Sequence, residues 1–419
     1  MREKPKVVIL GGGYGGVRAA LELAKTHKVQ VFVVDKNSYH TLPAQYYELG
    51  TLFREEEKLA TREEFHKYFY TAAVAFADIF RRCPDISFIK GEPDQVFPHH
   101  GLVVLKGGHK LHYDWLVLAL GSQTNYFDIP HLENNAIGFK QIEEVLNIRN
   151  RIDELFLQTP KRKKITVVVG GGGVTGTELA GELVRYMRKL AHIHARPVGA
   201  WSCIIVEASA TILGTSHPLI QKKARKRLTD LGVTLIFSSP IVDVWPNLLY
   251  IGKERRTLGF DLLVWTAGVK GACHGSIFAG IPVERRDCVM VAPTLQVEPF
   301  ANIFSVGDIA ASVDPKTHTP IPMTAQKAVW EGKYVAQAIL KLIKNSTIAL
   351  SPYKPKRPSF IIPIGGKYAL LETPHFTSSG FWVWCLKYLV LARYLFSILP
   401  ISKALGLLAN ELRLYTKND

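Results

Sequence analysis

The sequence predicts an α/β protein with two Rossmann-like dinucleotide-binding domains, followed by C-terminal amphipathic helices that anchor it to a membrane. Three observations predict this architecture. A glycine-rich GxGxxG loop occurs near residue 11 and again near residue 171. Each loop follows an apolar run and precedes an apolar helical pattern, which is the context that dinucleotide binding requires. The segment 351–419 is apolar, aromatic and basic.

The first nucleotide-binding unit begins near the N-terminus. The apolar run 6–10 predicts a buried parallel strand that leads into Gly11, Gly13 and Gly16. The glycines permit a tight turn and let the backbone approach a pyrophosphate at the N-terminus of the next helix, where unpaired N–H groups favour anions. Asp35 ends a later apolar run and is expected to accept hydrogen bonds from a ribose hydroxyl.

The second unit repeats this pattern. The apolar run 165–169 leads into Gly171, Gly173 and Gly176, and Glu207 follows a later apolar run. A carboxylate there accepts hydrogen bonds from a ribose 2′-hydroxyl and repels a 2′-phosphate. Two dinucleotides bound by one chain indicate electron transfer between them.

An internal repeat indicates that the architecture is duplicated. The segments 113–121 and 260–268 share an aromatic–Asp start, an apolar strand pattern and a terminal glycine. We therefore expect a first domain from residues 1–122 and 290–350, a second from residues 123–289, and a C-terminal membrane-associating segment, 351–419. A helix is expected from Ala325 to about residue 343.

The C-terminal segment contains two apolar stretches, 381–399 and 401–414, separated by a proline. The first could just span a bilayer, but Lys387 and Arg393 fall inside it and would be costly at mid-membrane. Its aromatic and basic residues favour a helix lying in the headgroup region. A helix pair that packs on a partner subunit is the alternative, because exposed apolar faces mark either kind of contact.

Composition excludes several classes of function. The chain of 419 residues carries a net charge of +16, with 47% hydrophobic residues. The basic runs 161–164 and 222–227 lack interleaved aromatics, so we expect solvated faces attracted to anionic lipid, and no nucleic acid partner. Five scattered cysteines without metal-like spacing predict a reducing compartment and no metal, and the N-terminus predicts no signal peptide.

The chain resembles the type II NADH:quinone oxidoreductases, which belong to the two-dinucleotide-binding flavoproteins. The resemblance extends from Val7 to about Leu414. The segments that carry it are the glycine loop 11–16, Asp35 to His40, Ala119 to Gly121, Thr175 to Glu178, Thr266 to Gly268, Val306 to Asp308, Thr324 to Gln326, and the stretch 386–395.

The resemblance implies FAD on the first unit. Asp308 would bind the ribityl or pyrophosphate region, and the helix beginning at Ala325 would direct its N-terminus at the isoalloxazine, favouring the anionic reduced flavin. The implied FAD-binding residues are Gly11, Gly13, Tyr14, Gly15, Gly16, Asp35, Lys36, His40, Gly121, Asp308, Ala325 and Gln326.

The resemblance places NADH, as substrate, on the second unit. Glu207 would select NADH over NADPH. Glu178 would face the flavin and the nicotinamide, although an acid in a first helical turn can also simply complement the helix dipole. The implied NAD-binding residues are Gly171, Gly173, Val174, Thr175, Gly176, Glu178, Glu207, Ala267 and Gly268.

The quinone side shows one departure from the family. Its helix usually reads Ala-Gln-x-x-x-Gln, and here Trp330 replaces the second glutamine. This puts the identity of the acceptor in doubt. The resemblance implies Gln326, Trp330 and Lys387 at the quinone, with Glu178, Gln326 and Lys387 as catalytic residues. It also implies a peripheral, monotopic protein on the cytoplasmic face, without proton pumping, and a homodimer as a candidate assembly.

Other flavoprotein functions stay open. Sulfide:quinone and disulfide reductases use placed cysteines, but the segment 36–60 has none and the chain after residue 308 has only Cys385. A reductase with a different acceptor, or a redox switch similar to apoptosis-inducing factor, remains an alternative.

Overall fold

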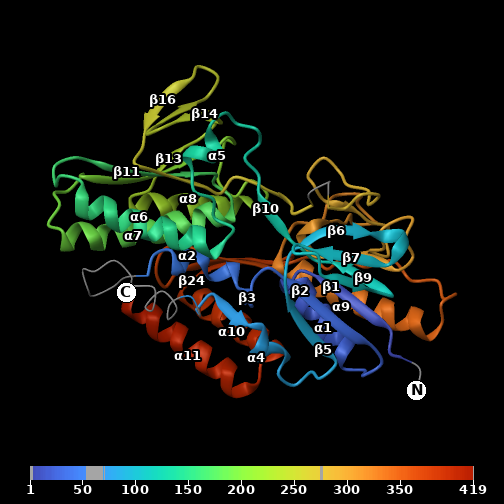
Figure 1. The fold of residues 1–419 in the computed structure, drawn as a ribbon. Helices are drawn as coiled ribbons and strands as arrows, with labels where there is room; N and C mark the ends of the chain where they lie inside the picture. Colours follow the sequence, from blue (N-terminus) through green and yellow to red (C-terminus); the bar gives the residue numbers. More distant parts are fainter. Residues whose placement is uncertain (1–2, 53–68, 70, 274–276, 419) are drawn as a thin grey trace.

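The computed structural model describes residues 3–52, 69, 71–273 and 277–418. Its first half is a parallel sheet in the order β20-β9-β1-β2-β5. Helices α1 (Tyr14–Ala24) and α9 (Ala325–Lys344) pack together beside this sheet (Figure 1). A small antiparallel sheet of β6 (Pro93–Phe97), β7 (Leu102–Leu105) and β8 (Lys110–His112) accompanies it. The parallel strands are β1 (Lys6–Leu10), β2 (Gln30–Asp35), β5 (Ile86–Lys90), β9 (Trp115–Leu118) and β20 (Ile303–Ser305).

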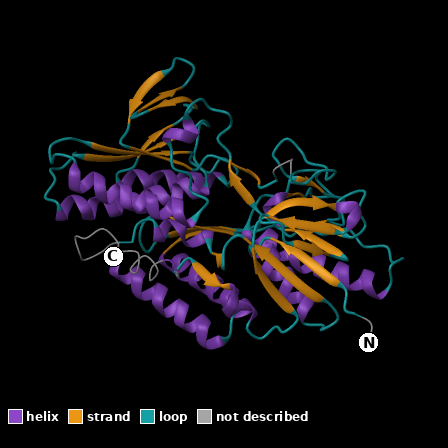
Figure 2. Cartoon of the chain, in the orientation of Figure 1, coloured by secondary structure: helices purple, strands orange, loops and turns teal. Residues whose placement is uncertain are grey.

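The second half repeats this design with a parallel sheet in the order β13-β12-β11-β17. Its strands are β11 (Ile165–Gly170), β12 (Trp201–Val206), β13 (Thr234–Ile236) and β17 (Leu262–Trp265). The accompanying helices are α6 (Ile142–Gln158), α7 (Val174–Ile193) and α8 (Pro218–Leu231). An antiparallel sheet is again added, from β14 (Ile241–Trp245), β15 (Leu248–Ile251) and β16 (Arg256–Gly259). Figure 2 shows strands and helices layered in both halves, so the predicted fold class is confirmed.

Two short strands cross between the halves. β10 (Ser122–Thr124) pairs antiparallel with β18 (Val269–Gly271). Beyond this crossing, Cys273, Phe278 and Ile281 pack into the core around the first sheet, although the sequence-based division assigned them to the second domain. All three residues precede residue 289, where the sequence-based division ends the second domain. That boundary stays a prediction.

One segment of the first half is buried in the second. After β3 (Tyr39–Thr41), the chain forms the short helix α2 (Tyr46–Leu49), which contacts α6 and α7. Arg149 on α6 is buried and donates from Nε to the carbonyl oxygen of Leu52 at 2.8 Å. Residues of α2 therefore lie against the helix that follows the second glycine loop. The remaining short elements are β4 (Ala73–Ala75), α4 (Phe76–Phe80), α5 (Leu132–Asn135), β19 (Val289–Met290), β21 (Ala310–Ala311), and the 3-10 turns Pro43–Gln45, Pro98–His100 and Gly307–Ile309.

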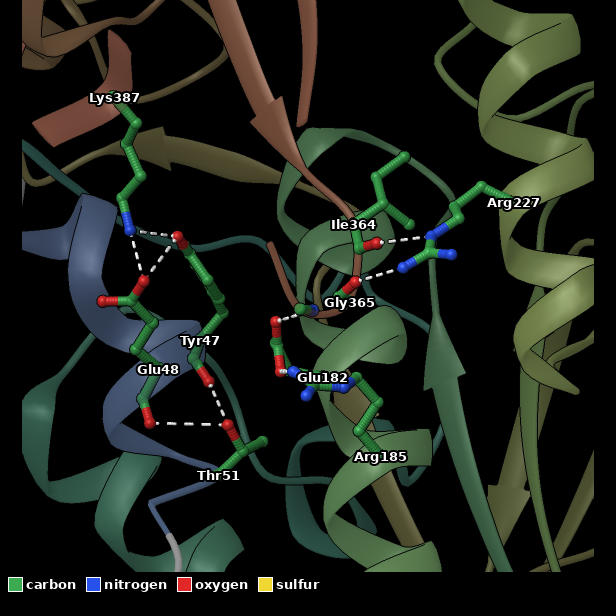
Figure 3. Close-up of polar contacts among 10 residues, drawn as sticks. Tyr47, Glu48, Thr51, Glu182, Arg185, Arg227, Ile364, Gly365 and Lys387 are labelled. Atoms are coloured by element: carbon green, nitrogen blue, oxygen red, sulfur yellow. Dashed lines mark hydrogen bonds and ion pairs between the residues drawn. The ribbon is translucent and has the colours of Figure 1, made fainter. Parts of the chain in front are cut away.

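The C-terminal segment begins with a three-stranded antiparallel sheet fixed to the second half. Its strands are β22 (Phe360–Pro363), β23 (Ala369–Glu372) and β24 (Thr377–Gly380). Arg227 on α8 donates from Nε to the carbonyl oxygen of Ile364 at 3.1 Å and from Nη2 to that of Gly365 at 2.5 Å. Glu182 on α7 accepts from the Gly366 N–H at 2.8 Å (Figure 3).

Two helices complete the chain, α10 (Phe381–Ile398) and α11 (Ile401–Asn418). They lie side by side below the body in Figure 1, with α11 outermost. Within the described residues, α10 is the helix long and apolar enough to cross a membrane. One face of the pair is packed into the core around α1 and α9, through Leu395, Ile398, Leu399 and Ala404. The exposed face carries Phe381, Trp382, Leu389, Val390, Phe396, Ile401, Leu405 and Leu412.

Candidate active site

The two glycine loops have the same geometry. Gly11 has φ +107° and Gly171 has φ +106°, a left-handed region in which side chains are strained. A Cβ on Gly16 would lie 1.9 Å from the carbonyl oxygen of Gly11, and one on Gly176 would lie 2.0 Å from that of Gly171. Each helix can therefore approach its preceding strand only because these residues are glycines.

The middle glycine of each loop is different. Gly13 caps α1, Gly173 caps α7, and a Cβ on either would meet no atom within 4 Å. The open space lies at the start of a helix, where backbone N–H groups have no partner within the helix. These cradles fit the pyrophosphates of two dinucleotides.

Asp35 closes the first loop from the end of β2. Its carboxylate accepts from the N–H of Gly12 at 2.7 Å and from that of Asn37 at 2.8 Å. Burial raises the pKa of Asp35, and the two backbone hydrogen bonds oppose this. Lys36, the next predicted FAD-binding residue, donates from its ammonium to the side-chain oxygen of Gln141 at 3.2 Å.

Glu207 occupies the equivalent position at the end of β12. Its carboxylate accepts from the N–H of Gly172 at 2.6 Å and from that of Ser209 at 2.7 Å. Val174 and Thr175, which begin α7 beside it, are exposed. Both acids thus stand where a ribose is expected, and each is oriented by its own glycine loop.

The strand ends predicted from the internal repeat lie near these loops. Gly121 follows β9 with φ +74°. Ala267 follows β17, and a Cβ on Gly171 would lie 2.6 Å from its Cα. Gly268 is packed beside the ring of Phe127, which a Cβ there would approach to 2.4 Å.

Tyr14 and Gly15 begin α1 beside the predicted flavin residue His40. The buried imidazole of His40 lies with Nδ1 3.0 Å from the carbonyl oxygen of Gly12. The ring of Tyr14 contacts it edge-on at 4.9 Å between centroids. A Cβ on Gly332 of α9 would lie 2.3 Å from the Gly15 carbonyl oxygen, so α1 and α9 cross closely here.

Asp308 lies at the turn after β20, between the halves of the chain. Its carboxylate accepts from the hydroxyl of Ser122 at 2.7 Å, and the ammonium of Lys140 lies 3.8 Å away. The N-terminus of α9 is nearby in sequence, with Ala325 exposed and Thr324 capping the helix by accepting from the Lys327 N–H at 3.1 Å.

A buried ion pair that sequence reasoning missed holds α9 against this turn. Glu331 accepts from the Gly307 N–H and from the Ser312 hydroxyl, both at 2.7 Å. Lys327 lies 3.8 Å from Glu331 and donates to the carbonyl oxygens of Gly307 and Ala310. Burial raises the pKa of Glu331 to about 7. The i, i+4 spacing was the signal that could have identified the pair.

Gln326 and Trp330 both face the segment 356–359. Gln326 donates from Nε2 to the carbonyl oxygen of Ser359 at 3.0 Å, and the ammonium of Lys356 lies 5.8 Å from the centre of the Trp330 ring. Trp330 also packs against the core around α1 and α9. The shared helical face predicted for the two residues is therefore observed, while their binding roles stay predictions.

Lys387 is buried on α10, where it meets α2 (Figure 3). Its ammonium forms an ion pair with Glu48 and donates to the hydroxyl of Tyr47, and it lies 4.9 Å from the centres of the Tyr47 and Tyr388 rings. Glu48 was missed because nothing in the sequence relates it to a lysine so distant in the chain.

Glu178 is the fifth residue of α7, so it lies beyond the first turn in which the sequence placed it. The charges of Lys387 and Glu48 act on its carboxyl group as well. Burial raises its pKa to about 8, Lys387 lowers the pKa and Glu48 raises it. On the other side, burial and Glu48 raise the pKa of buried Glu411 on α11 well above its usual value. The structure therefore brings the predicted catalytic residues Glu178 and Lys387 into one electrostatic cluster, whereas Gln326 has its observed contact at Ser359.

Comparisons with known proteins agree with this geometry. The pyridine nucleotide-disulphide oxidoreductase family model matches residues 5–332. The type II NADH:quinone oxidoreductase of Haemophilus influenzae is 26% identical over 379 residues, which are 84% of this chain and 83% of that protein. This relative confirms the resemblance predicted from the sequence.

Two solved structures share the fold. The structure of NDH2 from Plasmodium falciparum in complex with NADH has a TM-score of 0.84 at 19% identity and covers 98% of both chains. The sulfide:quinone oxidoreductase of Aquifex aeolicus has a TM-score of 0.76 at 18% identity, covering 94% of this chain and 91% of its own. Because the family model spans both glycine loops and most of the chain, the protein belongs to the pyridine nucleotide-disulphide oxidoreductase family.

Proposed function

We propose that the protein is a type II NADH:quinone oxidoreductase that holds FAD, oxidises NADH and reduces a membrane quinone without pumping protons. The observation that carries the proposal is the pair of matched glycine cradles, each with an oriented acid at its strand end. One cradle would hold the pyrophosphate of a flavin dinucleotide, and the other would hold that of a nicotinamide dinucleotide.

The first cradle fits FAD. Gly11, Gly13 and Gly16 would surround the pyrophosphate, Asp35 would accept from the adenine ribose, and Asp308 would bind near the ribityl chain. A bound flavin supplies the two-electron chemistry between donor and acceptor. The N-terminus of α9 contributes a positive dipole end, which favours negative charge on the reduced ring.

The second cradle fits NADH. Each carboxylate oxygen of Glu207 accepts one backbone hydrogen bond, from Gly172 or from Ser209, and these bonds fix its orientation. A carboxylate oxygen can accept more than one hydrogen bond, so a ribose diol could donate to it as well. A 2′-phosphate placed there would be repelled by the carboxylate. We therefore assign NADH, and not NADPH, as the donor.

The acceptor side is assigned to the cluster around Lys387. Reduction of a quinone requires two electrons and two protons, so a group that retains a proton near neutral pH is needed. Glu178 has such a pKa, about 8, and Lys387 is held in place by Glu48 and Tyr47. In this proposal Glu178 supplies one of the two protons and water supplies the other, and Gln326 and Trp330 line the quinone site from α9.

The thiols of Cys273 and Cys288 do not support the sulfide or disulfide chemistry of other proteins with this fold. Burial raises the pKa of Cys273 to about 12 and also raises the pKa of Cys288, whose Sγ lies 3.6 Å from the Asp308 carbonyl oxygen. Thiols with raised pKa values are poor nucleophiles. Transfer through a flavin needs no attacking side chain, so the quinone assignment is preferred.

The exposed apolar face of α10 and α11 fits a membrane surface. Lys387 and Tyr394 are directed into the body, so α10 could cross a bilayer only by leaving these contacts. We therefore assign a monotopic attachment to a membrane surface, which the resemblance to the family places on the cytoplasmic face. A second copy of the chain seated on the same face is the competing arrangement.

Anaerobic stopped-flow measurements test the function. We expect NADH to reduce the bound flavin rapidly, and a ubiquinone, menaquinone or plastoquinone analogue to reoxidise it. Trp330→Gln should change the preference among the three quinones while leaving reduction by NADH unaltered. Fast reduction without reoxidation by any quinone would instead indicate a redox-switch flavoprotein.

A further inference from the structure

Tyr394 of the C-terminal helix α10 reaches the first glycine loop through a single histidine. Its hydroxyl lies 2.8 Å from Nε2 of His40, and Nδ1 of His40 lies 3.0 Å from the carbonyl oxygen of Gly12. His40 is 1% exposed, so water does not compete for these hydrogen bonds. The apolar helix at the end of the chain is thus connected to the loop at its beginning.

The chemistry of the three groups fixes the direction of both hydrogen bonds. A carbonyl oxygen can only accept, so Nδ1 of His40 must carry a proton. Burial lowers the pKa of His40 to about 4, which leaves the ring neutral and Nε2 without a proton. Burial also raises the pKa of Tyr394, so its hydroxyl keeps its proton. Tyr394 therefore donates to His40, and His40 donates to Gly12.

This arrangement holds the peptide groups on both sides of Gly12. Its N–H donates to Asp35 at 2.7 Å, its carbonyl accepts from His40, and a Cβ on Gly12 would lie 2.1 Å from the ring of Phe76. The peptide orientation at residue 12 determines how the next residue, Gly13, presents its backbone to the open cradle. A small rotation here would misdirect the N–H groups expected to bind a pyrophosphate.

The same surface of α10 makes a second contact that does not involve the histidine. Arg18 of α1 donates from Nη2 to the hydroxyl of Ser397 at 2.6 Å, and that hydroxyl donates to the carbonyl oxygen of Tyr394 at 2.6 Å. The ring of Tyr14 contacts the rings of both His40 and Tyr394 at 4.9 Å. Helix α10 is thus linked to the glycine loop through His40 and to α1 through Arg18, and the two links are separable.

We propose that Tyr394 is a positioning residue for FAD, which acts through His40 on the Gly12 peptide so that tight retention of the cofactor requires the docked C-terminal helix. This inference rests on the proposed function, in which FAD occupies the first glycine loop. It makes the apolar C-terminal helix part of the flavin site in addition to its assigned place at the membrane.

The test compares FAD binding by the wild-type protein, Tyr394→Phe and Ser397→Ala. Phenylalanine keeps the ring packing but leaves Nε2 of His40 without a donor, whereas Ser397→Ala removes the other link and leaves His40 untouched. We expect Tyr394→Phe to weaken FAD binding about tenfold, or ~1.4 kcal/mol, in flavin-fluorescence titrations. Ser397→Ala should stay within about twofold of wild type. Because an unpaired buried acceptor also lowers the stability of the folded protein, all three affinities are measured well below the lowest unfolding midpoint of the three apoproteins.

A second measurement does not depend on any variant. The nitrogen chemical shifts of ¹⁵N-labelled histidine in the wild-type protein should show His40 as the neutral Nδ1–H tautomer from pH 5 to 8. An Nε2–H tautomer, equal FAD affinity in wild type and Tyr394→Phe, or equal losses in both variants would each overturn the proposal. A wild-type protein that binds no FAD at all would instead contradict the proposed function, and the inference would end with it.

Discussion

At the residue scale, Glu207 is expected to determine the choice of nicotinamide. Glu207→Gln keeps an oxygen that can accept from the Gly172 N–H but removes the negative charge. We expect the rate of flavin reduction by NADH, divided by the rate by NADPH, to fall about 10- to 100-fold, equivalent to ~1.4–2.8 kcal/mol. The exposed Glu254→Gln, between β15 and β16, is the matched control. An unchanged ratio in Glu207→Gln would show that another group selects the nucleotide.

Glu178 gives a prediction for pH. Its pKa is raised to about 8 from an unfolded value of 4.5, so the folded protein retains a proton that the unfolded chain releases between these values. Its contribution to folding stability therefore becomes less favourable as pH rises from 4.5 to about 8, and the neutral Glu178→Gln should remove that slope. Reoxidation by quinone should decline above pH 8 in the wild type, and Glu178→Gln should be slow at every pH. Stopped-flow rates and denaturant titrations across this range measure the two effects, and an unchanged pH profile would contradict the assignment.

At the element scale, the attachment of α9 depends on Glu331. Replacing it by alanine removes the carboxylate that balances the charge of the buried Lys327. It also leaves the Gly307 N–H and the Ser312 hydroxyl without their acceptor. Breaking a buried ion pair costs about 3–5 kcal/mol, and we expect a loss of this size in the free energy of unfolding by urea. The double variant Lys327→Met, Glu331→Leu should recover part of it. If the single variant lost less than about 1 kcal/mol, the pair would not hold the helix.

At the scale of the whole molecule, membrane attachment should be separable from the flavin chemistry. Leu389 is 67% exposed and Phe396 is 42% exposed on the outer face of α10. Replacing both by glutamate removes apolar contact and adds charges that anionic lipid repels, so binding to vesicles should fall at least about tenfold. Reduction of the flavin by NADH should be unaffected. Val198→Glu, at an exposed apolar residue of the second half, is the control in vesicle sedimentation. Unchanged sedimentation of the double variant would remove α10 from the membrane contact.

The sequence by itself determined the two Rossmann-like units, the glycine loops, Asp35 and Glu207 at the strand ends, and the two C-terminal helices. These features are local, because a strand run, a glycine turn and a helical pattern each occupy a short stretch whose sterics and periodicity can be recognised without a partner. Their placement in the structure follows the predicted order, from the first loop through α9 to α11.

Only the tertiary structure decided which distant residues meet. Glu48 and Lys387 are separated by 339 positions and His40 and Tyr394 by 354, and no spacing rule relates such pairs. Both pairs form because packing of α10 against α1 and α2 removes water around polar groups, which must then find partners within the protein. Burial also sets the pKa of Glu178, which a sequence position alone cannot reveal, because desolvation depends on all the elements packed around the carboxyl group.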